Sequence, residues 1–211
     1  MSAATGDQAL VAAAAVQLGQ VLRASARART VMLTAAYRIA PAVGHEGTPP
    51  ELSLCGSLLV QAALMAARSG DDRAAAGLLD EAAGMAAQVG DGHDHHRTSF
   101  GPTAVELARV AAAVRLGNGG DAVAHHETAT AREGWRWLPV EHRAAHLLDA
   151  ARAYLQTGGP TNAARVLVQA HGIAPAEVRH RPAARSVVAQ VARDPYAPAT
   201  LAQLGISLGV V

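Results

Sequence analysis

Lysine is absent from the sequence: all 18 basic residues are arginine, set against 17 acidic residues. The resulting formal net charge of +1 produces no extended field that would attract nucleic acid or an anionic membrane. We therefore expect no direct specific DNA binding by this chain and no membrane association.

Cysteine is nearly absent too, because Cys55 is the one thiol in 211 residues. A single cysteine excludes a disulfide within the chain and favours a reducing compartment. The opening stretch MSAATGDQALVAAAAV lacks the basic region typical of a secretory signal, and no apolar run reaches the ~18 residues of a membrane span. These absences predict a cytoplasmic protein.

Aromatic residues make up only 3% of the chain, although 50% of its residues are hydrophobic. The hydrophobic residues are mostly alanine, valine and leucine, so the interior has to be built from small side chains. Helices pack closely through such side chains, and alanine has the highest helix propensity, whereas alternating β-branched runs are few. The composition predicts an all-α protein.

A pattern of an apolar helix, a glycine and an alanine-rich helix recurs along the chain. In its clearest copy, from Leu147 to Pro175, the small, aromatic, turn and packing positions of a tetratricopeptide repeat hold Ala151, Tyr154, Gly158, Ala163, Leu167 and Ala170. The same spacing around Gly70 selects Ala63, Ala66, Ala75, Leu79 and Ala82, and around Gly117 it selects Val110, Ala113, Ala122, His126 and Ala129. We expect the small residues to lie where two antiparallel helices touch.

Loops rich in glycine and proline separate these copies. We expect one tetratricopeptide-like domain over residues 1–211, an array of antiparallel helical hairpins with about 9 to 10 helices that winds into a right-handed α–α superhelix. The predicted repeats cover roughly residues 6–43, 50–90, 102–132 and 139–175, followed by capping helices at 176–209.

Three short segments show a family resemblance: FGPT at Phe100 to Thr103, HLLDAARAY at His146 to Tyr154, and APAEVR at Ala174 to Arg179. With the order of the helices around them, they resemble the C-terminal tetratricopeptide-like region of actinobacterial XRE-type helix-turn-helix transcriptional regulators. The resemblance implies an effector-sensing role, often in secondary metabolism. Family members place a DNA-binding domain ahead of this region, so we expect either a fragment or a stand-alone module.

The predicted binding site is the concave groove of the array. His146, Asp149 and Arg152 follow one another at three-residue steps on a predicted inner helix, and Glu106 with Arg109 forms a comparable pair one repeat earlier. The expected ligand-binding residues are Arg97, Phe100, Thr103, Glu106, Arg109, Trp135, Trp137, His146, Asp149 and Arg152. Trp135 and Trp137 suit either a plug between repeats or a lid that stacks on a flat ligand.

The histidines raise the question of a metal. The stretch HDHHRTSF at residues 93–100 reads as a solvated loop, with ligand contact through His96 and Arg97 or a metal site as alternatives. His142 and His146 have a spacing that can bind zinc, but the HExxH signature and a third ligand are missing. His126 falls at a packing position, which favours a buried structural histidine. We expect no metal and no cofactor.

The leading functional hypothesis is a binding module for a small molecule or peptide, the effector-sensing part of a transcriptional regulator or a stand-alone derivative of one. A second hypothesis is a biosynthetic enzyme that reuses the groove for non-redox, cofactor-free chemistry, with His146, Asp149 and His96 as acid–base groups. A protein–protein interaction scaffold is the third, and a homodimer is compatible with each. The sequence shows no nucleophile elbow, phosphate loop or dinucleotide fingerprint.

Overall fold

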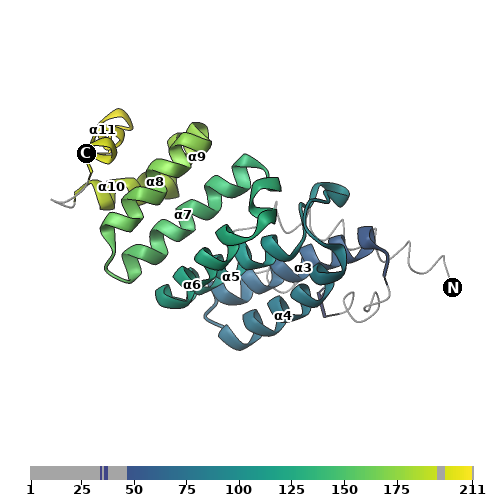
Figure 1. Ribbon diagram of the computed structural model, residues 1–211. Helices are drawn as coiled ribbons and strands as arrows, with labels where there is room; N and C mark the ends of the chain where they lie inside the picture. Colours follow the sequence, from purple (N-terminus) through teal and green to yellow (C-terminus); the bar gives the residue numbers. More distant parts are fainter. Residues whose placement is uncertain (1–33, 35, 38–46, 194–197, 211) are drawn as a thin grey trace. The chain divides into compact units, whose positions relative to one another are not determined.

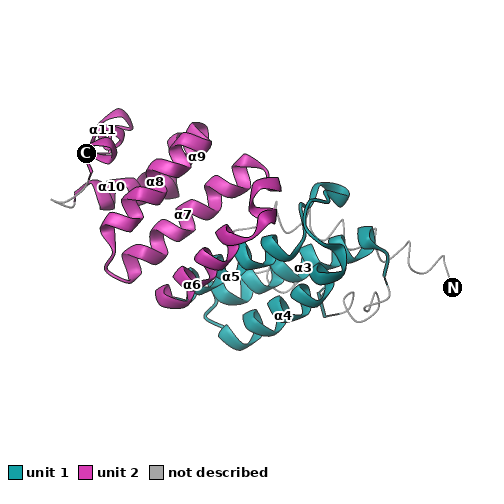
Figure 2. Cartoon of the chain, in the orientation of Figure 1, with its two compact units in different colours: residues 1–116 teal, residues 117–211 magenta. Residues whose placement is uncertain are grey.

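The computed structural model describes residues 34, 36–37, 47–193 and 198–210, so the predicted first repeat at 6–43 lies almost wholly outside the described residues. Within them the chain is all-α and contains no strand, which confirms the predicted fold class. Figure 1 shows the helices in chain order, and Figure 2 the two compact units into which the chain divides, residues 1–116 and 117–211.

Unit 1 is built around one helical hairpin. Its elements within residues 47–116 are α3 (Pro49–Arg68), α4 (Asp72–Val89), the 3-10 turn η1 (His95–Arg97) and α5 (Pro102–Leu116). α3 starts with a capping box, in which the Thr48 backbone N–H donates to Glu51 at 2.9 Å. The carboxylate of Asp71 caps α4 by accepting the Ala74 N–H at 3.1 Å. Gly70, with a φ of 76°, makes the turn between the two helices.

Small side chains let α3 and α4 pack closely, and α5 packs against both. The contact uses fully buried alanines, including Ala62, Ala63 and Ala66 on α3 and Ala82 on α4. By length and composition alone, α3 could cross a membrane, the one helix of the described residues to pass that test. However, 61% of its apolar window is buried inside the protein, as expected for a core helix.

Unit 2 contains a second hairpin and the C-terminal helices. Its elements are α6 (Gly119–Ala131), the 3-10 turn η2 (Glu133–Trp137), α7 (Val140–Gln156), α8 (Pro160–Ile173), α9 (Pro175–His180), α10 (Pro182–Ala192) and α11 (Ala199–Ser207). α7 and α8 form the hairpin, with Gly158 at a φ of 73° in its turn, and α6 packs on α7. A proline opens each of α8, α9 and α10, where a missing N–H costs nothing.

The residues selected by the repeat spacing are all buried. This holds around Gly70 for Ala63, Ala66, Ala75, Leu79 and Ala82, around Gly117 for Val110, Ala113, Ala122, His126 and Ala129, and around Gly158 for Ala151, Tyr154, Ala163, Leu167 and Ala170. The first and last sets lie on hairpins that the structure describes. The middle set lies on α5 and α6, which belong to different units, so a single repeat array stays a prediction.

Candidate functional site

The FGPT motif is part of the packing of unit 1. The Phe100 side chain is 3% exposed, and its ring lies against Gly56 of α3, where a Cβ atom would come within 2.0 Å of the ring. Thr103 is fully buried, and both its backbone N–H and its hydroxyl donate to the carboxylate of Asp91. Both predicted ligand contacts are therefore engaged with the protein itself.

The histidine-rich loop before α5 turns its side chains outward. His96 and Arg97 are exposed, and both have the left-handed backbone conformation, with φ of 54° and 57°. His93 and His95 stack with ring centroids 5.6 Å apart, while Asp94 accepts the Ser99 N–H at 2.8 Å. Among the described residues, no cluster of three or more histidine, cysteine, aspartate or glutamate side chains is placed to hold a metal.

Two of the three predicted arginines, Arg109 and Arg152, form ion pairs within their own units. In unit 1, Arg109 Nη2 lies 2.8 Å from Asp80 Oδ1, and its Nε lies 3.6 Å from a carboxylate oxygen of Glu106. In unit 2, Arg152 Nη1 lies 2.7 Å from Asp149 Oδ1. Their charges are thus balanced locally, and a ligand that bound either arginine would compete with a carboxylate.

The predicted stripe of His146, Asp149 and Arg152 does not lie on one exposed face of α7. His146 is only 4% exposed, whereas Asp149 and Arg152 are half-buried. The reason is helical geometry: each three-residue step turns by about 300°, so two steps move a side chain about 120° around the helix. His96, the third acid–base candidate, is an exposed residue of unit 1.

Two buried histidines meet in unit 2, and we call them the histidine pair. Nδ1 of His126 on α6 lies 2.8 Å from Nε2 of His146 on α7. Trp135 of η2 contacts His146 edge-on with ring centroids 5.4 Å apart, and Tyr154 contacts His126 in the same way at 5.9 Å. Trp135 is thus partly buried against the core of unit 2, whereas Trp137 is 54% exposed.

Burial keeps the histidine pair neutral. Burial, together with the smaller effect of the neighbouring His126, lowers the pKa of His146 to about 3. The pKa of His126 is also lowered, mainly by burial and then by the Arg165 guanidinium, with Glu127 acting in the opposite direction. Within the described residues, the buried Nδ1 of His146 has no hydrogen-bond partner.

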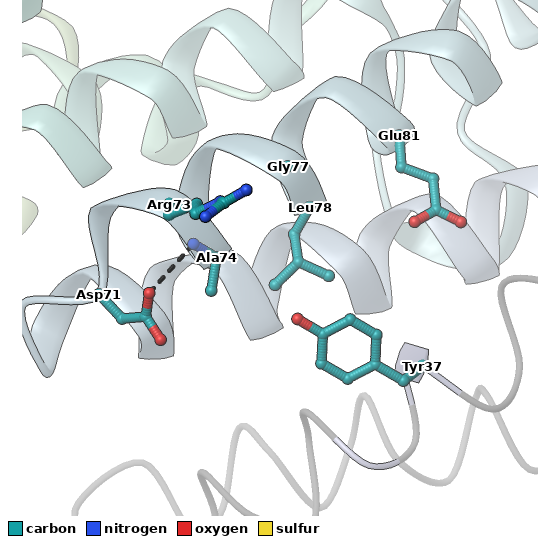
Figure 3. Close-up of a pocket in the computed structure, with 7 residues that line it drawn as sticks. All are labelled: Tyr37, Asp71, Arg73, Ala74, Gly77, Leu78 and Glu81. Carbon is teal, nitrogen blue, oxygen red and sulfur yellow. Dashed lines mark hydrogen bonds between the residues drawn. The ribbon is translucent and has the colours of Figure 1, made fainter.

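A hollow of about 360 Å³ lies beside α4 in unit 1, and we call it the α4 hollow (Figure 3). It is lined by Tyr37, Asp71, Arg73, Ala74, Gly77, Leu78 and Glu81. The lining of α4 follows the 3- and 4-residue spacing of one helix face, and Figure 3 shows the Tyr37 ring opposite Leu78. A Cβ atom on Gly77 would meet no described atom within 4 Å, so glycine leaves room there.

The α4 hollow combines an apolar floor with charged ends. Ala74 and Leu78 form the apolar part, Asp71 and Arg73 lie at the start of the helix, and Glu81 lies farther along it. Asp71 and Glu81 are ten residues apart, about 15 Å along a helix axis. The arrangement can bind an elongated molecule that has both an apolar surface and ionic groups.

The chain matches no protein-family model, and no curated protein or solved structure is significantly similar to it.

The α4 hollow was not predicted from the sequence, and none of the predicted ligand-binding residues lines it. The available signal was Gly77, a glycine in the middle of a helix where alanine would be favoured by propensity. Sequence analysis identified His126 as a packing residue and His146 as a candidate, but it did not join them into a pair.

Proposed function

We propose that the protein is a binding module that holds a small molecule or a short peptide in the α4 hollow. The volume of about 360 Å³ supports this proposal, since sites for small ligands typically measure about 300 to 1,000 Å³. A mostly apolar cleft with a few polar groups is the usual composition of such sites. The α4 hollow is more polar than such a site, because three charged residues accompany Ala74, Gly77, Leu78 and the Tyr37 ring, so it suits a ligand that has ionic groups.

The charges around the α4 hollow favour a ligand with groups of both signs. A carboxylate of the ligand would pair with Arg73, and a cationic group would pair with Glu81. The ring and hydroxyl of Tyr37 supply a flat apolar surface and a hydrogen-bonding group on the opposite side. An amino acid derivative or a short peptide meets these requirements.

The biological setting that we propose is the effector-sensing part of a transcriptional regulator, or a stand-alone derivative of one. The support is the resemblance of FGPT, HLLDAARAY and APAEVR to segments of that regulator family. On this proposal, ligand binding is the input, and contact with DNA belongs to another domain or protein.

The proposal is tested by screening amino acids and dipeptides for binding to the full chain by ligand-observed NMR. Each hit is then titrated against Gly77→Leu, which fills the α4 hollow, and Arg73→Ala, which removes its cation. We expect each substitution to weaken binding by about tenfold or more.

The matched control is Gly172→Leu, because Gly172 is another helical glycine with no described atom within 4 Å of its added Cβ. Binding should be unchanged in this control. A screen without hits, or hits whose affinity survives both Gly77→Leu and Arg73→Ala, would contradict the proposed function.

A further inference from the structure

We propose that the histidine pair is an acid-sensitive latch that fastens α6 to α7 at neutral pH and releases it when the pair takes up a proton. The latch belongs to unit 2, so it is independent of the α4 hollow and of the proposed ligand.

The proposal depends on the small number of large buried side chains that hold α6 in place. The buried residues of this helix are Gly119, Ala122, His126 and Ala129. Three of them have a side chain no larger than a methyl group, so His126 supplies the largest buried side chain of α6. Its imidazole bonds to α7 through His146 and packs on Tyr154 of the same helix. Losing this contact removes the largest buried side chain that holds α6, and leaves its small buried residues and the half-buried Val123.

The arrangement of protons makes the pair sensitive to acid. The pair has four ring nitrogens, and one proton is shared between Nδ1 of His126 and Nε2 of His146. In the neutral pair one of the two outer nitrogens is bare, and Nδ1 of His146 suits this state because it has no acceptor among the described residues.

A further proton changes this balance. If the shared hydrogen bond is kept, both outer nitrogens must then hold a proton, so Nδ1–H of His146 becomes a buried donor without an acceptor. The same step places a positive charge in a site that is 4% exposed. Release of α6 avoids both costs because it lets water solvate the imidazolium.

The surrounding groups give the added charge little compensation. Arg165 of α8 acts against a positive charge on His126, and the Glu127 carboxylate of α6 favours it more weakly. Against His146 lie His126 and the edge of Trp135 from η2, neither of them a carboxylate. On α7 itself, Arg143 lies one turn before His146 and Asp149 one turn after it, so their charges act in opposite directions, and Asp149 is already paired with Arg152.

Hydrogen exchange followed by mass spectrometry tests the latch in the full chain. Protection factors, corrected for the intrinsic effect of pH, are compared at about pH 7.5 and about pH 5. We expect protection of α6 to fall by about tenfold or more in acid, while protection of the α3–α4 hairpin stays within about twofold.

Two variants separate the latch from a general effect of acid. The double variant His126→Leu/His146→Leu removes both imidazoles, so no buried ring nitrogen is left without a hydrogen-bond partner. We therefore expect α6 to stay protected at both pH values. His142→Leu removes an exposed histidine one turn before His146 and should behave like the wild type. The proposal would be overturned if acid lowered the protection of α6 equally in the double variant and in the wild type. It would also be overturned if α6 stayed protected in the wild type at about pH 5.

The wild-type chain offers a second measurement that does not depend on the folding of the double variant. Imidazole nitrogen chemical shifts should show both histidines neutral at about pH 7, with Nδ1 of His146 unprotonated. A charged pair at that pH, or a charged pair with α6 still protected, would overturn the latch. All measurements are repeated with a chelator, and a chelator effect would replace the latch with a metal site.

Discussion

Asp91 holds the start of α5 by accepting two hydrogen bonds from Thr103, one from the backbone N–H at 2.9 Å and one from the hydroxyl at 2.7 Å. Asp91 lies two residues after the end of α4, so this one carboxylate ties the end of the first hairpin to the next helix. The contact also gives the FGPT motif a structural role, in which Phe100 packs in the core and Thr103 donates its hydrogen bonds to Asp91.

Replacing Asp91 should therefore destabilise unit 1. We expect Asp91→Ala to lower the free energy of unfolding by about 1 to 3 kcal/mol, because it removes a helix cap and leaves the buried Thr103 hydroxyl without its acceptor. Urea unfolding followed by circular dichroism measures the change. Asp94→Ala, which removes an exposed carboxylate from the same loop, should cost less, and the reverse order would contradict the capping role.

Gly56 leaves the space that the Phe100 ring occupies. Gly56→Ala would place a Cβ atom 2.0 Å from Cζ of Phe100, so the ring has to move within a packed core. We expect destabilisation of about 1 to 3 kcal/mol in thermal unfolding. Gly77→Ala is the control, because its Cβ enters open space and should stabilise α4 by about 0.5 to 1 kcal/mol. Similar effects at both glycines would be inconsistent with the contact.

The α7–α8 hairpin depends on small residues at its contact. Ala151 and Ala163 are fully buried, so Ala151→Leu or Ala163→Leu should push the helices apart and cost about 1 to 3 kcal/mol. Ala124→Leu on α6 provides the comparison, since that side chain is exposed and should change stability by less than about 0.5 kcal/mol. Chemical denaturation of the three variants measures these changes in the free energy of unfolding. Unchanged stability in both Ala151→Leu and Ala163→Leu would refute the predicted repeat spacing.

Much of this hairpin architecture could be predicted from the sequence. Gly70 and Gly158 supply the turns, and the alanines spaced around them are buried. The spacing of small residues along a helix fixes which face packs, so positions such as Ala63 and Ala163 could be selected without a structure.

The candidate sites were harder to predict, because they depend on how helices cross. Spacing along α6 shows that His126 is buried, but its contact with His146 depends on the rotation of α6 relative to α7. The α4 hollow depends on Tyr37, which is more than thirty positions away from the helix face that it lies against. The same limit applies to Asp91, which could not be assigned to Thr103 from a separation of 12 residues.

Stability should depend on pH because His146 stays neutral in the folded protein. Its pKa is about 3 when folded and about 6.5 when unfolded, so the unfolded state binds more protons between these values. The contribution of His146 to the free energy of unfolding should thus be constant above about pH 6.5 and fall by about 1.4 kcal/mol per pH unit well below it. Urea unfolding between about pH 8 and pH 4 measures this slope, which should be shallower in His126→Leu/His146→Leu.

The single thiol should be inert in the folded protein. Cys55 is fully buried, and burial, aided by the Glu81 carboxylate, raises its pKa to about 12. Because only the thiolate attacks alkylating reagents, we expect labelling at neutral pH to be slower than in the urea-unfolded chain by about a hundredfold or more. Mass spectrometry after timed exposure to iodoacetamide measures the rate. Labelling at the unfolded rate would contradict the packing of α3.

The many buried alanines also affect how stability varies with temperature. A methyl group exposes little hydrocarbon surface to water when the chain unfolds, and the heat-capacity change of unfolding scales mainly with that surface. We therefore expect this change to lie at or below about 12 cal/mol/K per residue, the lower end for globular proteins. A small heat-capacity change flattens the curve of unfolding free energy against temperature. The small-residue core should thus keep the stability of this protein nearly constant over a wide thermal range.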